Sequence, residues 1–317
     1  MAERHVLAFW NFENLFDAAD AVRVEGLAKR LAKELKGWSA AVLDRKIANL
    51  AGAIRAMDGG KGPGILGVCE VESKAVLHRL AAAIDGDRYA VVHADGLDQR
   101  GIDSAFLFDT RRYTQVPGSV FTHFVMRRTY TRDILQASFR TASGRELVLF
   151  ANHWPSRSGG RFKSEPYRMT AGETLAHWHN RVHEERGENI TVLAMGDFND
   201  EPFDRSLVDY AQATNTRGRV TRARSVRRFL NLMAPLAGAA EGSYVFGGQP
   251  NMLDQILAGR SALSGAAGLT VDGPATTLRP PGVKAAPRPF KRPAVKGGAD
   301  PDGFSDHHAV GVVLRET

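Results

Sequence analysis

Polar side chains follow the apolar run at residues 190–195. The run ends at Gly196, and Asp197 and Asn199 come directly after it. Because alternate side chains share a face of an extended chain, these two would project together, about 6–7 Å apart along the backbone. A carboxylate and an amide are hard oxygen groups that suit Mg²⁺ or a phosphoryl oxygen. The same pattern is also typical of an acidic turn after a strand, so its interpretation depends on the other strand ends.

Other apolar runs carry polar groups of the same kind, at their ends or within them: Asn11 and Glu13, Glu70, His153, Asp254, and Asp306 with His307. A buried carboxylate without a partner is costly, so Glu70 and Asp254 each require a metal or a basic partner. The histidines and spare carboxylates supply an acid and a base near neutral pH. The single cysteine, Cys69, lies inside an apolar run and is predicted to be a buried thiol. The pattern therefore favours a hard-metal site over zinc–thiolate chemistry.

The elements that must position these groups are strands alternating with helices. Apolar positions at alternating spacings of four and three predict an amphipathic helix from Leu43 to Met57, ended by Gly59 and Gly60. No short repeat or sharp change of composition divides the chain. Strands are expected at 5–12, 65–71, 89–93, 105–108, 146–151, 190–195, 251–257 and 309–314, further helices at 18–36, 76–84 and 165–186, and a hairpin region at 116–142.

The charge of the chain favours a polyanionic partner. It has 317 residues, with 42 Lys and Arg against 35 Asp and Glu, for a net charge of +7. Six arginines between residues 217 and 228 form either a phosphate-tracking surface or an ordinary solvated face. Residues 272–303 are rich in Pro, Gly, Lys and Arg and predict a long, mobile, basic loop. No signal-peptide core or membrane-length apolar run is present, so we expect a cytoplasmic protein without a membrane span.

These motifs, taken in order, resemble the motif set of the endonuclease/exonuclease/phosphatase superfamily, the deoxyribonuclease-I-like metal-dependent phosphodiesterases. The resemblance runs from residue 10 to residue 308. It implies an α/β (α+β) fold, a four-layered α/β sandwich of two mixed β-sheets packed face to face with helices outside, forming one domain over residues 1–317. The stretches that carry it are Trp10-Asn11-Phe12-Glu13-Asn14, Cys69-Glu70, Asn152-His153-Trp154, Gly196-Asp197-Phe198-Asn199, Leu253-Asp254 and Ser305-Asp306-His307.

The resemblance also implies a metal site that holds Mg²⁺ or Mn²⁺. Glu70 corresponds to the principal metal ligand, and Asn11 assists it. Asp306 corresponds to the acidic residue beside the metal, and Glu13 stands where family members often carry an acidic residue near it.

The remaining motif residues correspond to catalytic groups. His307 would contact the scissile phosphate, and Asp254 would orient it. Asp197 and Asn199 would position the attacking water and the phosphoryl oxygens. His153 resembles the second histidine of the deoxyribonuclease branch. Either Asp197 or His307 can serve as the base that activates the water.

The expected function is a Mg²⁺- or Mn²⁺-dependent phosphodiester hydrolase, a nuclease that cleaves DNA or RNA by in-line attack of an activated water. Arg100 and Arg157, beside the motifs, are candidate phosphate clamps, with surface salt bridges as the alternative. One alternative function is a phosphatase or a phosphodiesterase of small molecules such as inositol phosphates, nucleotides or lipids. Another is a catalytically silent nucleic-acid-binding protein. Every acidic and imidazole position of the motif set is filled, and this argues against a silent protein.

Overall fold

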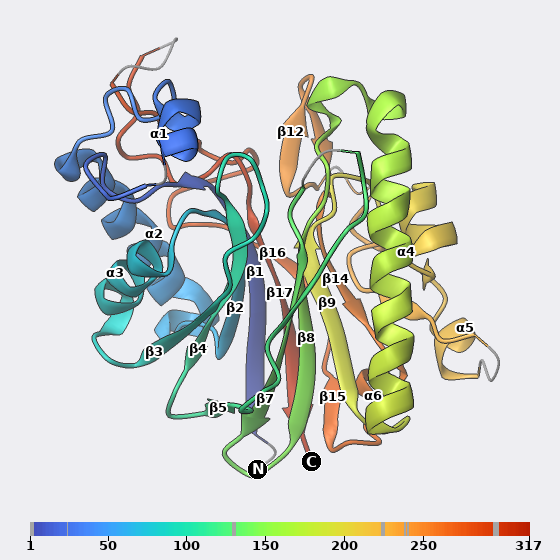
Figure 1. The fold of residues 1–317 in the computed structure, drawn as a ribbon. Coiled ribbons are helices and arrows are strands. Elements are labelled where there is room, and N and C mark those ends of the chain that lie inside the picture. The colour runs from blue at the N-terminus through green and yellow to red at the C-terminus, as the bar shows by residue number, and fades with distance from the viewer. Residues whose placement is uncertain are drawn as a thin grey trace.

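The computed structural model describes residues 3–23, 25–128, 131–222, 226–237, 239, 241–293 and 298–317. Two mixed β-sheets stand side by side, and helices cover their outer faces (Figure 1). The expected α/β sandwich is therefore confirmed. Figure 1 also shows both termini at one end of the sheets and the long connecting loops at the other.

The first sheet has seven strands, in the order β15-β17-β1-β2-β4-β3 with β16 paired to β17. β1 and β2 are parallel, whereas β17 is antiparallel to β1. The strands are β1 (Arg4–Leu15), β2 (Ile65–Val71), β3 (Tyr89–His93), β4 (Asp103–Asp109), β15 (Leu269–Val271), β16 (Thr276–Leu278) and β17 (Ala309–Glu316).

The second sheet has eight strands, in the order β10-β11-β14-β9-β8-β7-β5 with β6 paired to β7. β8 and β9 are parallel, whereas β14 is antiparallel to β9. The strands are β5 (Tyr113–Gln115), β6 (Phe121–His123), β7 (Ile134–Thr141), β8 (Glu146–His153), β9 (Thr191–Asp197), β10 (Ala213–Thr214), β11 (Phe229–Asn231) and β14 (Asp254–Ala258). A separate hairpin pairs β12 (Tyr244–Phe246) with β13 (Gln249–Asn251).

Helices α2 (Ala40–Gly60) and α3 (Lys74–Asp85) cover the first sheet, and α4 (Arg161–Arg186) covers the second (Figure 1). The amphipathic helix expected at 43–57 lies within α2, where Ser39 caps the first turn by accepting a hydrogen bond from Val42 N. The remaining helices are α1 (Glu25–Leu31), α5 (Arg217–Thr221) and α6 (Arg260–Ser264). The helix expected at 18–36 is wrong at both ends, because only α1 is helical there.

The core between the sheets joins apolar side chains from both. Phe9 and Phe106 of the first sheet and Phe139 and Met195 of the second belong to one fully buried cluster. Each sheet thus presents one apolar face to the other and one to its helices, which explains why its central strands read as nearly continuous apolar runs.

The arrangement gathers the polar strand ends at one edge. β1 and β2 end there together, as do β8 and β9. β14 and β17 run the opposite way and begin there, so Asp254 pairs directly with Asp197, and the residues before β17 arrive at the same edge. Strand direction and register therefore assemble the site.

Two segments singled out in the sequence take other forms. Residues 272–303 are not a continuous loop, because β16 lies within them, and residues 294–297 fall outside the described residues.

The arginine-rich segment includes α5, which lies near the outer face of the second sheet and far from the gathered strand ends (Figure 1). Arg217 donates to Leu263 O, Arg227 to Glu188 and Arg228 to Gln212, while Arg224 falls outside the described residues. The solvated-face interpretation fits these contacts better. In the part of the chain that is described, no helix is long and apolar enough to span a membrane.

Gly196 provides a test of the close packing beneath the site. A Cβ there would lie 2.5 Å from Asn152 O on the paired strand. Because Asn152 O is a backbone atom, it cannot move aside as the end of a flexible side chain could. We expect Gly196→Ala to lower the free energy of unfolding by about 1–3 kcal/mol through this overpacking, as measured by urea denaturation. The matched control is Gly218→Ala, whose Cβ would meet nothing within 4 Å. Equal stability of the two variants would contradict the close approach of β8 and β9.

Candidate active site

A buried carboxylate–imidazole pair forms the centre of the site. His307 Nδ1 lies 2.6 Å from Asp254 Oδ2, and Asp254 is fully buried. Ser243 Oγ accepts hydrogen bonds from Leu253 N and Asp254 N and so holds the start of β14. Burial opposes the positive charge of His307, but Asp254 and Asp306 outweigh it and raise its pKa well above the ordinary value. His307 is therefore an imidazolium with a fixed orientation.

Further contacts hold His307 in place. Trp10 Nε1 donates to His307 O at 2.9 Å, and His307 N donates to Ser305 Oγ at 3.1 Å. The ring of Tyr244 packs against the imidazole with 4.7 Å between centroids. Sequence reasoning missed Tyr244 and Ser243, because they lie ten or more residues before Asp254 in a stretch without a strong pattern.

Asp197 lies between the two histidines. Its Oδ2 is 4.0 Å from His307 Nε2, 3.8 Å from His153 Nε2, and 3.1 Å from Asn11 Nδ2, which donates to it. Burial raises the pKa of Asp197 to about 7, although His307 acts in the opposite direction. A carboxylate with this pKa is suited to accept a proton near neutral pH.

Asn199 reaches the site by a different route from the expected one. The strand ends at Asp197, and Asn199 has a φ of 51°, so the two do not share a face of an extended chain. Instead Asn199 N donates to Asp197 Oδ1 at 2.9 Å, and Asn199 Nδ2 donates to Trp154 O at 3.1 Å. The turn still leaves Asn199 in the wall of the site.

Glu70 and Asn11, in β2 and β1, adjoin this group, because Glu70 Oε1 lies 3.6 Å from His153 Nε2 and Asn11 donates to Asp197. Glu70 Oε2 accepts a hydrogen bond from Asn14 N at 2.9 Å, and Glu70 Oε1 lies 3.5 Å from Asn11 Nδ2. Glu70, Glu13 and Asn14 all have positive φ angles, between 53° and 62°. Non-glycine residues in this conformation are strained, and such strain clusters at functional sites. Glu72, two residues further along the chain, forms a buried ion pair with Arg23.

The carboxylate of Glu13 lies in a neighbouring cavity. Its Oε2 accepts a hydrogen bond from Phe290 N at 2.9 Å, and its backbone carbonyl accepts one from the buried Lys46 Nζ at 2.6 Å. Burial raises the pKa of Glu13 to about 7, while Lys46 opposes this. Because β1 bulges after Asn11, Glu13 lines a neighbouring cavity rather than the one that contains Glu70.

His153 is neutral, in contrast to the positive charge of His307. Arg132 Nη2 lies 2.9 Å from His153 Nε2 and also donates to Trp154 O. Burial, together with Arg132, holds the pKa of His153 well below its ordinary value. Of the two histidines, only His307 is therefore suited to stabilise negative charge. Arg132 was missed, because arginines recur throughout its segment and nothing in the sequence distinguished it.

The two arginines proposed as phosphate clamps differ in their contacts. Arg157 donates to Asn199 O at 2.6 Å, to Asp204 Oδ2 at 2.9 Å and to Asn251 Oδ1 at 3.2 Å, so its guanidinium braces the loops around the site. Arg100 is exposed and donates to Asn14 Oδ1 at 3.4 Å. Both line the site, but Arg100 has the greater freedom to meet a substrate anion.

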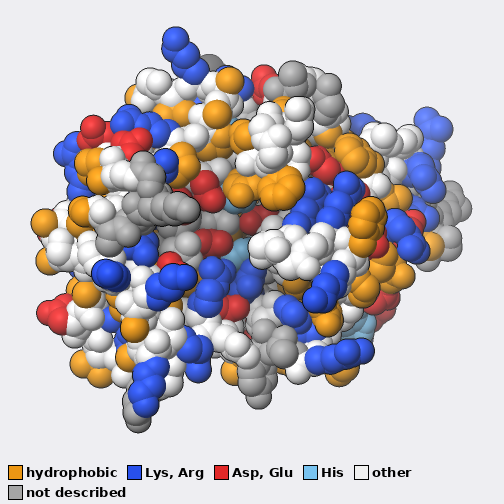
Figure 2. Space-filling view, turned by 90° about the horizontal axis from the view of Figure 1, so that it is seen from above, with side chains coloured by type: hydrophobic (Ala, Val, Ile, Leu, Met, Phe, Trp, Pro, Cys, Tyr) orange, Lys and Arg blue, Asp and Glu red, His pale blue; other side chains and the backbone are white. Residues whose placement is uncertain are grey.

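We name the resulting hollow the central cavity. It has a volume of about 360 Å³, and its lining includes Glu70, Asp197, Asp306, His307 and Arg100. Figure 2 shows acidic side chains deep in a hollow at the centre of this face, with Lys and Arg side chains around it. An anion would therefore meet a basic rim before it reaches the acidic floor.

The donor set fits a hard divalent cation. Glu70, Asp197 and Asp306 all present carboxylates to the central cavity, whereas the charged His307 has no free lone pair to offer a metal. Burial raises the pKa of Asp306, and Glu70 raises it further, which shows that negative charges repel one another here. Cys69 is buried and its pKa is raised well above the ordinary value, so it offers no thiolate. Oxygen ligands in excess of nearby cations are typical of Mg²⁺ or Mn²⁺ sites.

Sequence comparison agrees with this architecture. A model described as Endonuclease/Exonuclease/phosphatase family matches residues 6–316. The chain therefore belongs to the endonuclease/exonuclease/phosphatase family and has its phosphoesterase fold. No curated protein matches the chain.

Solved structures share the fold over the whole length. An endonuclease/exonuclease/phosphatase family protein from Bacteroides thetaiotaomicron is 15% identical, with a TM-score of 0.59 and coverage of 100% of this chain and 99% of that chain. A mannosyl-6-phosphatase from the same organism is 16% identical, with a TM-score of 0.58 and coverage of 98% and 99%. D. rerio TDP2 complexed with a single-strand DNA product is 14% identical, with a TM-score of 0.53 and coverage of 98% of both chains. At these identities the likeness shows the fold alone.

Lys46 provides a test of how the metal side of the site is held. Its hydrogen bond to the Glu13 carbonyl supports the turn from which Asn14 N reaches Glu70. We expect Lys46→Met to weaken Mn²⁺ binding about 10–100-fold, as outer-shell substitutions commonly do, measured by isothermal titration calorimetry. Lys74→Met, at an exposed position on α3, is the control and should leave binding unchanged. Unaltered affinity in Lys46→Met would show that the turn does not depend on this bond.

Proposed function

We propose that the chain is a divalent-metal-dependent phosphodiester hydrolase that acts as a nuclease on DNA or RNA. The observation that carries the proposal is the meeting of Glu70, Asp197 and the charged His307 in one basic-rimmed cavity. The similarity in fold to D. rerio TDP2, which was solved with a single-strand DNA product, supports a nucleic-acid substrate. We further propose that residues 1–317 form one domain that acts in the cytoplasm.

In this proposal His307 donates a hydrogen bond from Nε2 to a phosphoryl oxygen. Its Nδ1 is held by Asp254, so Nε2 alone faces the cavity, and its positive charge balances the charge that develops on phosphorus oxygens during attack. Asp254 acts through His307, because it fixes the ring and maintains its charge.

Asp197 would accept the proton of the attacking water. Its pKa of about 7 allows the ionised form to be present at neutral pH, and its hydrogen bonds from Asn11 and Asn199 N fix both carboxylate oxygens. The chain thus places a base and a charged hydrogen-bond donor 4.0 Å apart, and a phosphate that enters from the basic rim would meet both.

Glu70 and Asp306, with help from Asn11, would hold Mg²⁺ or Mn²⁺. When bound, the metal supplies Lewis-acid stabilisation of the phosphate charge. Arg100 would meet the entering substrate, whereas Arg157 would maintain the loops that line the cavity. Asn11 also donates to Asp197, so it connects the metal side of the site to the water-activating side.

A second candidate function is hydrolysis of a small phosphoester. The mannosyl-6-phosphatase of similar fold and the modest size of the central cavity, about 360 Å³, favour it. The arginine-rich segment is no argument for a polymeric substrate, because α5 lies far from the site (Figure 1). The two functions differ in how many substrate charges lie on the protein surface.

Glu70→Gln tests the metal assignment. It removes one negative charge from the site but leaves the side-chain shape, so we expect loss of Mg²⁺-dependent hydrolysis by two or more powers of ten, with little change in thermal stability. Glu72→Gln, two residues further on, is the matched control. Because Glu72 is paired with Arg23 away from the cavity, that variant should lose stability and keep its activity per folded molecule. Full activity of Glu70→Gln would remove Glu70 from the metal site.

Salt dependence distinguishes the two functions. We expect cleavage of single-stranded DNA or RNA to fall at least tenfold in kcat/KM between about 50 and 200 mM NaCl, because a polymer releases counterions when it binds. Hydrolysis of methyl p-nitrophenyl phosphate should change much less. Efficient turnover of a small sugar phosphate, without any cleavage of nucleic acid, would select the phosphatase alternative.

A further inference from the structure

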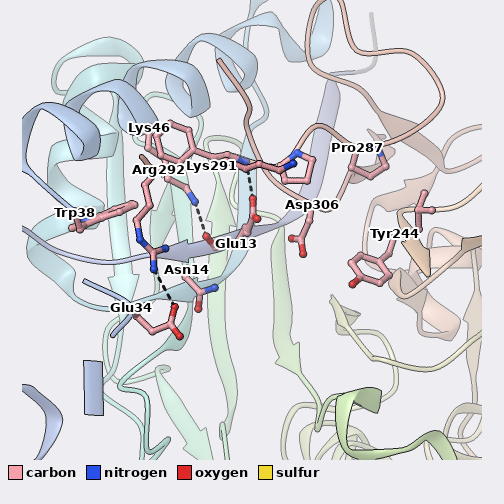
Figure 3. A pocket seen from close by; sticks show the side chains of 13 residues that line it. Glu13, Asn14, Glu34, Trp38, Lys46, Tyr244, Pro287, Lys291, Arg292 and Asp306 are labelled. Carbon is pink, nitrogen blue, oxygen red and sulfur yellow. Dashed lines mark hydrogen bonds and ion pairs between the residues drawn. The ribbon is translucent and has the colours of Figure 1, made fainter. Parts of the chain in front are cut away.

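A second cavity adjoins the central cavity, and we name it the side cavity. Its volume of about 560 Å³ is larger than that of the central cavity and lies within the range of about 300–1,000 Å³ that is common for small-molecule sites (Figure 3). Tyr244 and Asp306 line both cavities. A group attached to a phosphate beside His307 can therefore extend past Tyr244 into the side cavity.

Separate segments of the chain build the side cavity. The end of β1 contributes Glu13 and Asn14, α2 contributes Lys46, β12 contributes Tyr244 and Val245, and the segment at residues 287–292 covers it. That segment is anchored, since Phe290 N donates to Glu13 Oε2 at 2.9 Å and the Phe290 ring packs 5.2 Å from Lys46 Nζ. The cavity is thus formed in advance by tertiary contacts.

The charges of the side cavity are balanced. Three acidic side chains (Glu13, Glu34 and Asp306) and three basic ones (Lys46, Lys291 and Arg292) line it among the described residues. Arg292 lies 3.6 Å from Glu34 and so pairs with it, and Lys46 donates to the backbone carbonyl of Glu13. A second phosphate would meet carboxylates as well as cations, so the side cavity favours an uncharged polar group.

The lining suits hydroxyl groups and C–H faces at the same time. In Figure 3 the Asp306 carboxylate and the Tyr244 hydroxyl point into the open space, with Asn14 on the opposite side. Carboxylate, amide and phenol oxygens all accept hydrogen bonds from hydroxyl groups. Val245 and Pro287 add apolar wall, against which the C–H face of a ring can pack.

We propose that the side cavity binds the sugar ring esterified to the phosphate in the central cavity. This inference rests on the proposed phosphoester hydrolysis and narrows its substrate to a phosphorylated sugar. The ring can come from a nucleoside at the end of a nucleic acid or from a free hexose phosphate, which share the same hydroxyl-bearing chemistry. The hydroxyls bind Asp306, Tyr244 and Asn14, and the ring packs on Val245.

The test measures binding of phosphonates, whose C–P bond the enzyme does not hydrolyse, by calorimetry with Mg²⁺ present. The probes are methylphosphonate, a nucleoside 5′-phosphonate, a hexose 6-phosphonate and methylenediphosphonate. Val245→Trp fills the side cavity from a position that does not line the central one. Val208→Trp is the matched control, because Val208 is 39% exposed, similar to the 38% of Val245, and lies outside both cavities. Pro287→Trp fills the same space from another segment.

In the wild type and in Val208→Trp, we expect at least one sugar phosphonate to bind tenfold or more tightly than methylphosphonate. Val245→Trp and Pro287→Trp should reduce that advantage to less than threefold and leave the affinity for methylphosphonate unchanged. The nucleoside and hexose probes identify the source of the ring. Equal affinity for sugar phosphonates and methylphosphonate in the wild type would overturn the proposed sugar site and leave the proposed phosphoester hydrolysis standing. A gain for methylenediphosphonate that exceeds the gain for both sugars would overturn it in favour of a second anion site. Failure of every probe to bind would overturn the proposed function as well.

Discussion

The burial of several carboxylates at one edge between two sheets is the constraint on which the rest of the site depends. Asp197 and Asp254 are 2% and 0% exposed, and burial raises the pKa values of Asp197 and Asp306. Such a cluster is stable only when cations and hydrogen-bond donors surround it. The protonated His307, the amide of Asn11 and the backbone N–H groups of Asn14 and Asn199 are therefore requirements of the fold as well as parts of the site.

Strand pairing meets this requirement with little freedom to move. Asp254 is fixed opposite Asp197 by β14 and β9, and His153 is fixed beside Asp197 by β8 and β9. A shift of one residue in either register would turn these side chains to the other face of the sheet. The helices support the site from outside the sheets. Lys46 of α2 donates a hydrogen bond to the turn at Glu13, and α4 covers the second sheet (Figure 1).

In the proposed mode of binding, the two cavities divide the recognition of a substrate between charge and shape. The central cavity combines a basic rim with an acidic floor, which suits a phosphate that meets a bound cation. The side cavity has balanced charge and an apolar wall from the β12–β13 hairpin. Tyr244 lines both cavities and packs on His307. A substrate group in the side cavity would therefore lie next to His307, the residue proposed to contact the phosphate.

The sequence by itself determined the fold class, the family and most of the residues that meet in the central cavity. It could do so because apolar runs that end in Asp, Glu, Asn or His are local patterns, and their order along the chain resembles the motif set of a known family, which implied the fold. It did not foresee the local geometry of Asn199 and Glu13, because positive φ angles turn their side chains away from the alternation of a regular strand. Only the tertiary structure decided the charge of each histidine, since that charge depends on whether Asp254 or Arg132 is the neighbour. The side cavity was likewise decided by tertiary structure alone, because its walls come from segments that lie far apart in the chain and carry no shared pattern.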